Sequence, residues 1–226
     1  MTYNNITPGI FLSRPNQFIA QVKIDGEARI CHVKNTGRCE ELLVPGATIY
    51  ADKAQNPARK TQYDLIAVEK GKRLINMDSQ IPNKVFAEWL AHSGYIKDIA
   101  KIRPETVYKT SRFDFYIETK CAKIFAEVKG VTLERDGIAM FPDAPTLRGV
   151  KHLSALCDCV DNGYRAICVF IIQMKDVGHF TPNNKTHPEF GAALKNAAKH
   201  GVEIFALDCH VTPNSITAAD FVPVVF

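Results

Sequence analysis

Two carboxylates and a lysine lie on two consecutive segments with strand character. The segments, 111–118 and 123–132, are rich in aromatic and β-branched residues and are separated by a short polar turn, which predicts a β-hairpin. Asp114 lies on the first strand, and Glu127 and Lys129 share one face of the second, because side chains alternate between faces along a strand. A register that joins these strands side by side would bring the three groups together.

Such a cluster has a definite chemistry. Two converging carboxylates form a hard-oxygen site for a divalent cation such as Mg²⁺, and a neighbouring lysine can orient a water or stabilise phosphate charge. These are the requirements of metal-dependent phosphodiester hydrolysis. On the first strand, alternation also puts Arg112 and Tyr116 on the face of Asp114.

The same residues have a purely structural interpretation. A half-exposed strand alternates polar and apolar residues, so Glu127 and Lys129 could form an ordinary solvated face. Their neighbours Phe125, Ala126 and Val128 are apolar, however, and charges on so apolar a strand are costly unless they are paired or bind an ion. The residues alone leave both interpretations open.

Length and composition set the wider limits. The chain has 226 residues, 46% of them hydrophobic, which fits one large or two small domains with an ample core. No apolar stretch approaches the roughly 18 residues of a membrane span, and the N-terminal residues lack the apolar segment of a signal peptide. We therefore expect a cytoplasmic protein without a membrane partner. The seven cysteines are scattered and odd in number, so we expect them to be reduced.

The charge distribution permits nucleic-acid binding without requiring it. The net charge is +4, and residues 1–80 carry 11 Lys and Arg against 8 Asp and Glu, which is +3 of that total. The same residues contain about five strand candidates, a strong Asp25-Gly26 hairpin signal and no long helix, which predicts a small barrel of the OB type. Such barrels often bind single-stranded nucleic acid on a basic face. Candidate contacts there are Arg14, Asn16, Lys34, Arg38, Arg59 and Lys60. Each could equally be a solvated loop residue.

Helical periodicity appears after the first 80 residues. Asn83 is a predicted cap for a helix over 84–93, which carries Glu88 at the edge of its apolar face. Residues 95–103 are predicted to be a short helix or irregular. A helix over 146–160 follows the hairpin, with Thr146 as its predicted N-cap.

The second half of the chain predicts a mixed sheet. On the helix over 146–160, Arg148, Lys151 and His152 fall at three- and four-residue offsets, so we expect a basic patch on one side, a position suited to phosphate contact. Strand segments 165–173 and 202–207 lack alternation, as buried parallel strands do. Between them we predict a polar loop over 179–187 and then a helical segment. We predict an N-terminal OB-like barrel over 1–80 and an α/β domain over 81–226, α+β overall.

Several segments resemble the sugar fermentation stimulation protein A family, in the same order along the chain. The matching segments are 32–38, 41–46, 59–61, 82–83, 111–115, 127–129, 141–153 and 180–183. The resemblance covers nearly the whole chain. It implies an OB-like domain followed by a domain similar to PD-(D/E)xK nucleases, in a DNA-binding protein linked to the regulation of sugar, particularly maltose, metabolism.

The nuclease pattern of that superfamily implies roles for individual residues. It makes Asp114 and Glu127 the ligands of Mg²⁺ or Mn²⁺ and Lys129 the catalytic lysine, with Glu88 as the acidic residue that the first helix often supplies. Arg112, Arg148 and Lys151 would contact nucleic acid beside this site. Two positions depart from the expected pattern: Gly130 replaces a small hydroxyl residue, and Gln17 replaces a second arginine.

Three functions are therefore considered. The first is a protein that binds DNA, or RNA, with a nuclease-like metal site. The second is an active Mg²⁺-dependent nuclease that cleaves DNA or RNA. The third, an enzyme acting on a sugar or sugar phosphate, has little support because the sequence has no Gly-rich phosphate loop. The sequence leaves the oligomeric state open, a homodimer included.

Overall fold

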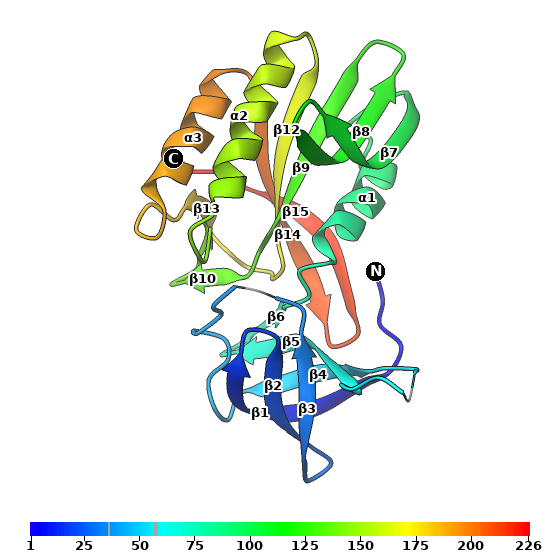
Figure 1. Cartoon of the computed structure of the whole chain (residues 1–226), viewed down its shortest axis with the longest axis vertical. Helices are drawn as coiled ribbons and strands as arrows, with labels where there is room; N and C mark the ends of the chain where they lie inside the picture. The colour runs from blue at the N-terminus through cyan, green and yellow to red at the C-terminus, as the bar shows by residue number, and fades with distance from the viewer. Residues whose placement is uncertain (36, 57) are drawn as a thin grey trace.

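The computed structural model describes residues 1–35, 37–56 and 58–226, and it has two parts stacked along the long axis (Figure 1). Thr36, in the matched segment 32–38, lies outside the described residues. An N-terminal barrel forms the lower part of Figure 1, and a helix-covered sheet forms the upper part. No helix in the described part of the chain is long and apolar enough to cross a membrane.

The barrel has five strands, as predicted. They are β1 (Ile6–Asn16), β2 (Ile19–Ile24), β3 (Glu27–Val33), β4 (Thr48–Lys53) and β5 (Tyr63–Lys70). β1 pairs with both β2 and β4, β4 pairs with β5, and a parallel β3–β5 pairing closes the cylinder. β6 (Arg73–Asn76) extends the sheet beyond β5. This is the connectivity of an OB-type barrel, and it confirms the predicted fold of the N-terminal region.

The second part is built on a mixed six-stranded sheet. Its strands, in spatial order, are β15 (Ser215–Val222), β14 (Glu203–Thr212), β12 (Arg165–Ile172), β9 (Lys123–Val131), β8 (Ser111–Thr119) and β7 (Ile99–Tyr108). β9, β12 and β14 are parallel, whereas the outer pairings are antiparallel. The predicted mixed sheet is confirmed. A small sheet of β10 (Leu133–Arg135), β11 (Ile138–Phe141) and β13 (His179–Pro182) lies beside it.

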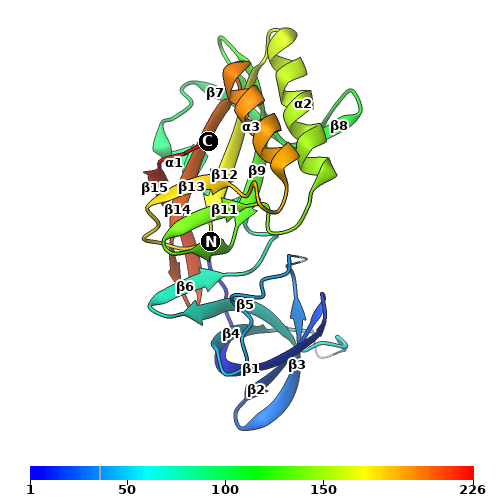
Figure 2. The ribbon, with the colours of Figure 1, turned by 90° about the vertical axis from the view of Figure 1, so that its left-hand side faces the viewer.

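Helices cover both faces of the large sheet. α1 (Pro82–Ser93) packs on one face, and α2 (Leu147–Asp161) and α3 (Pro188–Lys199) pack together on the other, as Figures 1 and 2 show. Thr146 caps α2 by accepting a hydrogen bond from the Gly149 N–H, as predicted. α1 ends at Gly94, whose φ of 66° is the left-handed conformation that favours glycine.

Three local predictions are wrong. Residues 95–103 are not helical: most belong to β7, an edge strand whose exposed residues give no apolar pattern to reveal it. The polar segment 179–187 contains β13, which pairs in parallel with β11. Asn83 is not the helix cap, because α1 begins at Pro82 and Asn83 lies in its first turn.

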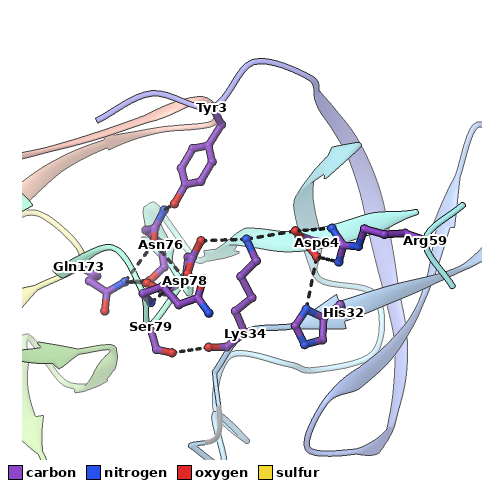
Figure 3. A network of polar contacts seen from close by, with 10 residues as sticks. Tyr3, His32, Lys34, Arg59, Asp64, Asn76, Asp78, Ser79 and Gln173 are labelled. Carbon is purple, nitrogen blue, oxygen red and sulfur yellow. Dashed lines mark hydrogen bonds and ion pairs between the residues drawn. The ribbon is translucent and has the colours of Figure 1, made fainter. Parts of the chain in front are cut away.

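A buried ionic network lies at the junction between the barrel and the sheet domain (Figure 3). The Lys34 ammonium, just after β3, is 3.1 Å from the Asp64 carboxylate and 3.4 Å from that of Asp78. Those two side chains are only 8% and 2% exposed. Arg59 also donates to Asp64, at 2.6 Å and 3.1 Å. Burial opposes ionisation of Asp64, but hydrogen bonds from Arg59 and Lys34 outweigh it and hold the pKa of Asp64 below its ordinary value.

Neutral hydrogen bonds extend this network into the sheet domain. The Gln173 side-chain amide, just after β12, donates to the carbonyls of Asn76 and Asp78, both at 3.1 Å. The Asn76 amide donates in turn to the Tyr3 hydroxyl at 3.0 Å. The barrel, the N-terminal segment and the sheet domain are therefore joined through the link between β6 and α1.

We expect Lys34→Met to destabilise the protein strongly. Arg59 would still pair with Asp64, but the buried Asp78 carboxylate would lose its ion pair with Lys34, and the expected cost is about 3 kcal/mol of unfolding free energy. Chemical denaturation of the wild type, of Lys34→Met and of the exposed control Lys72→Met measures this cost. A loss for Lys34→Met no larger than that of the control would show that the network contributes little to stability.

Candidate metal centre and nucleic-acid interface

Strands β8 and β9 separate at Asp114. Their ladder runs from Glu118 and Lys123 to Phe115 and Ala126 and goes no further. Beyond that point the Asp114 carboxylate accepts a hydrogen bond from the Val128 N–H at 2.8 Å. The Asp114 carboxylate therefore satisfies a backbone N–H that would otherwise bond a carbonyl of the neighbouring strand.

The alternation of β8 changes at the same position. Phe113 packs into the cluster on the α2 side of the sheet, whereas Phe115 packs into the cluster on the α1 side, although regular alternation would put both on one face. Asp114 lies between them, and Asn83 of α1 donates to its other carboxylate oxygen at 2.9 Å. Tyr116 belongs to the α2 side, so the expected common face of Asp114 and Tyr116 is wrong.

Glu127 is the most buried of the predicted site residues, with 3% of its surface exposed. Its Oε1 accepts hydrogen bonds from the Lys129 ammonium and from Nδ1 of His152 on α2. Its Oε2 is buried and has no hydrogen-bond partner among the described residues. Burial opposes ionisation of Glu127, but the bonds from His152 and Lys129 outweigh it, so the pKa of Glu127 lies below its ordinary value.

The pKa of Asp114 is shifted in the opposite direction, above its ordinary value. Burial raises the pKa of Asp114, and the negative charge of Glu127 raises it further. The Val128 N–H and the Asn83 amide lower it, but by less. The structure thus brings Asp114, Glu127 and Lys129 close enough for electrostatic interaction.

One feature of the carboxylate cluster favours a divalent cation, and another limits the number of ligands that the protein can supply. A buried carboxylate oxygen without a hydrogen-bond donor is costly, and a hard cation would satisfy it. Across residues 1–35, 37–56 and 58–226, no three His, Cys, Asp or Glu side chains gather as a metal-binding group. The protein would therefore supply only two carboxylates, from Asp114 and Glu127, and backbone or water oxygens would complete the shell.

Glu88 does not join this cluster. Its carboxylate is half exposed and accepts a hydrogen bond from the N-terminal amine of Met1 at 2.7 Å. It lies five residues after Asn83, about 140° around the helix, so the face that reaches Asp114 carries Asn83 instead. The expectation that Glu88 is a catalytic residue is not supported by its position.

Several predicted nucleic-acid contacts are occupied within the protein. The Arg14 guanidinium donates to four backbone carbonyls, those of Gln17, Asn35, Gly37 and Arg38, at 2.6–2.9 Å. It orders the loops around it, and its role as a phosphate contact stays a prediction.

Lys34, Arg59 and Asn16 are occupied as well. Lys34 and Arg59 neutralise the buried Asp64, as described above, and are held within the junction network. The Asn16 side chain accepts from the Phe18 N–H at 2.9 Å, within its own turn. The contacts of these three residues stabilise the barrel and its junction with the sheet domain.

The remaining predicted contacts are exposed. Arg38 and Lys60 lie on the barrel, Arg112 lies on β8 two residues before Asp114, and Arg148 and Lys151 lie on α2, which carries His152. Arg148 Nε approaches Nε2 of His152 at 3.4 Å, and Lys151 donates to the Thr110 carbonyl at 3.1 Å. Arg112 forms an exposed ion pair with Glu105 at 2.9 Å.

Two residues of the cluster were missed from the sequence. Asn83 was interpreted as a helix cap, and His152 was assigned to a basic patch with Arg148 and Lys151. The helical spacing placed His152 near Arg148 correctly, but His152 is buried and bonds Glu127, so it is not part of an exposed patch. Nothing in the sequence places Asn83 opposite Asp114, because that contact depends on how α1 packs.

Close packing explains why position 130 carries glycine and not the expected small hydroxyl residue. A Cβ there would come within 2.7 Å of both the Gln173 side chain and Pro82 at the start of α1. Only glycine allows so close an approach, so the departure from the pattern reflects packing next to Lys129.

Comparison with known proteins identifies the family. Residues 12–77 match the family model described as the SfsA N-terminal OB domain, and residues 80–215 match the sugar fermentation stimulation protein RE domain. The chain belongs to the sugar fermentation stimulation protein family. A family member from Desulfitobacterium hafniense (strain Y51) is 62% identical, covering 99% of this chain and 98% of its own. Another, from Clostridium beijerinckii, is 59% identical and fully covered in both chains.

A solved structure of the family has the same fold. Pyrococcus furiosus SfsA, in complex with Ca²⁺, matches 100% of this chain and 98% of its own with a TM-score of 0.90 at 30% identity. The barrel and the mixed-sheet domain therefore occur together in a distant family member.

We expect Asp114→Asn to stabilise the metal-free protein at neutral pH. The folded-state pKa of Asp114 is raised, so its ionised form lowers stability above that pKa, and the penalty disappears as the pH falls below it. An amide keeps an acceptor for the Val128 N–H without the charge. Thermal melts in EDTA at pH 7 should show a rise in Tm of roughly 2–4 °C, the shift that about 1 kcal/mol produces in a chain of this length.

The pH dependence distinguishes this cause from a general effect. The difference in Tm between Asp114→Asn and the wild type should shrink toward pH 4, whereas the exposed control Asp136→Asn should change little at either pH. A lower Tm for Asp114→Asn at pH 7 would contradict the assigned charge penalty.

Proposed function

We propose that this protein binds DNA or RNA and holds Mg²⁺ or Mn²⁺ at Asp114 and Glu127, in a nuclease-like site. The observation that carries the proposal is Glu127 Oε2, a buried carboxylate oxygen without a hydrogen-bond partner among the described residues, in a cluster with the half-buried carboxylate of Asp114. The Val128 carbonyl would be a third, backbone ligand. A cation would relieve the repulsion that raises the pKa of Asp114.

The family relatives support a divalent cation. The Pyrococcus furiosus protein was solved in complex with Ca²⁺, another hard cation that prefers oxygen ligands. At 30% identity over the whole chain, the relative makes the same preference reasonable here. The family name links these proteins to sugar fermentation, and we propose the regulation of sugar metabolism, maltose included, as the setting.

The nucleic-acid partner is proposed from the barrel and from the exposed cations. OB barrels commonly bind nucleic acid, and Arg38 and Lys60 are exposed on this one. Arg112, Arg148 and Lys151 are exposed near the carboxylates, where a bound backbone would bring phosphates toward the cation.

Binding is tested with labelled single-stranded, duplex and branched DNA and with RNA, by fluorescence anisotropy over a salt series in EDTA. The affinity should fall steeply with salt, and Arg38→Glu and Lys151→Glu should weaken it for all sequences. Each lost phosphate contact should reduce the salt slope by about 1. Lys199→Glu, an exposed substitution on α3, is the control. Affinities that stay equal in all three variants would exclude the proposed contacts.

Phosphodiester hydrolysis is a second candidate, favoured by Lys129. Its side chain is only 14% exposed, and its ammonium is held on the Glu127 carboxylate, on the strand face toward α2. From that position it could orient a water or meet a phosphate oxygen. A bound cation would supply a water of lowered pKa and offset phosphate charge. The protein's own contribution is to hold Lys129 and the carboxylates in a partly dehydrated place, where their charges act strongly.

Cleavage is tested on the same nucleic acids with Mg²⁺ or Mn²⁺ added. Asp114→Ala and Lys129→Met should each reduce cleavage by at least roughly 100-fold, the lower range for loss of a group that stabilises the transition state. Lys123→Met, at the exposed start of the same strand, should leave cleavage unchanged. Equal cleavage by wild type and Asp114→Ala would remove the hydrolytic function and leave nucleic-acid binding.

A further inference from the structure

We infer that His152 is a positioning residue for the cation site: it holds one oxygen of Glu127 so that the other is left for the cation. The inference rests on the proposed cation site and assigns a role to a residue of α2 that neither ligates nor reacts. It is drawn from the contacts of a buried side chain in the protein interior.

His152 is held rigidly on the inner side of α2. Only 5% of its surface is exposed, and its ring meets the Phe113 ring edge-on, with centroids 5.9 Å apart and planes at 68°. Its Nδ1 bonds Oε1 of Glu127 across the interface between α2 and β9. A ring packed in this way has few alternative orientations, so the bond to Glu127 has a fixed direction.

Arg148 fixes the proton on the required nitrogen. The Nε group of arginine can only donate, and it approaches Nε2 of His152 at 3.4 Å. Nε2 must therefore accept, which leaves the proton of the neutral ring on Nδ1, facing Glu127. The same imidazole can then serve as a donor to the carboxylate without carrying a charge.

The two carboxylate oxygens of Glu127 have different tasks as a result. Oε1 is shared by two donors, Lys129 and His152, while Oε2 is buried without a partner among the described residues. Two donors on one oxygen fix the rotation of the carboxylate and direct the other oxygen away from them.

The two donors of Glu127 are not equivalent. Lys129 is a flexible side chain, 14% exposed, that could turn toward a phosphate. His152 would then remain as the donor that holds Glu127. Residues that hydrogen-bond a metal ligand commonly change metal affinity by about 10–100-fold when they are replaced.

Three substitutions of His152 separate its contacts. His152→Asn places an amide nitrogen where Nδ1 stands and can still donate to Glu127. His152→Gln places its amide nearer to Nε2 and Arg148, and His152→Phe keeps the ring volume without a donor. If His152 positions Glu127, Mn²⁺ affinity measured by titration calorimetry should fall about 10–100-fold in the Phe and Gln variants. It should stay within about threefold of wild type in the Asn variant, because the donor to the metal ligand is kept.

Three further measurements exclude a merely structural role. Thermal melts in EDTA report any loss of stability, and nucleic-acid binding in EDTA, which needs no cation, should be unchanged in all three variants. The ¹⁵N NMR spectrum of labelled histidine should show His152 protonated at Nδ1 and not at Nε2 in the wild type.

The possible outcomes lead to different conclusions. A wild-type protein that binds no Mn²⁺ would overturn the proposed site and this inference together. If the wild type binds Mn²⁺ and His152→Phe binds it equally well, only the inference fails. Loss of affinity in His152→Asn equal to that in His152→Phe would also overturn it, as would a ring protonated at Nε2. If His152→Phe does not fold, the comparison of the Asn and Gln variants decides the question.

Discussion

The burial of the Glu127 charge is the constraint on which the rest of the candidate site depends. An ionised carboxylate in the interior is stable only when it is paired and hydrogen-bonded. Lys129 on the same strand and His152 on α2 provide those contacts, and both use Oε1. The packing of α2 on β9 therefore supplies one of the donors to the buried carboxylate. The other oxygen, Oε2, is buried without a hydrogen-bond partner among the described residues.

The opposite pKa shifts of the two carboxylates follow from this arrangement. Glu127 has cationic and polar donors, so it stays ionised, whereas Asp114 has a backbone N–H and a neutral amide, and it also faces the charge of Glu127. Folding thus assembles an electrostatically unfavourable pair at the point where β8 and β9 separate. Such local cost is common where a site awaits a ligand of opposite charge, and the stability of the surrounding sheet tolerates it.

The sequence predicts what depends on neighbouring residues and misses what depends on packing. Asp114, Glu127 and Lys129 meet because a hairpin joins their strands locally. Glu88 was misplaced because the rotation of α1 is set by how its apolar face packs on the sheet, and β7 was missed because an exposed edge strand has no apolar pattern. The change in alternation at Asp114 could not be predicted either, since it arises where the ladder with β9 stops.

The basic residues of the barrel show a further limit of sequence interpretation. A cation is available to a phosphate only if no buried acid or backbone carbonyl requires it, and the sequence does not show which acids are buried. Lys34 and Arg59 compensate Asp64 within the junction network, and Arg14 donates to four backbone carbonyls. A nucleic acid would therefore meet the cations that remain exposed. Among the predicted contacts, the exposed cations lie on two surfaces, one on the barrel with Arg38 and Lys60 and one on the sheet domain with Arg112, Arg148 and Lys151. Because one network joins the barrel to the sheet domain, a strand that contacts both surfaces would be held in a fixed relation to Asp114 and Glu127.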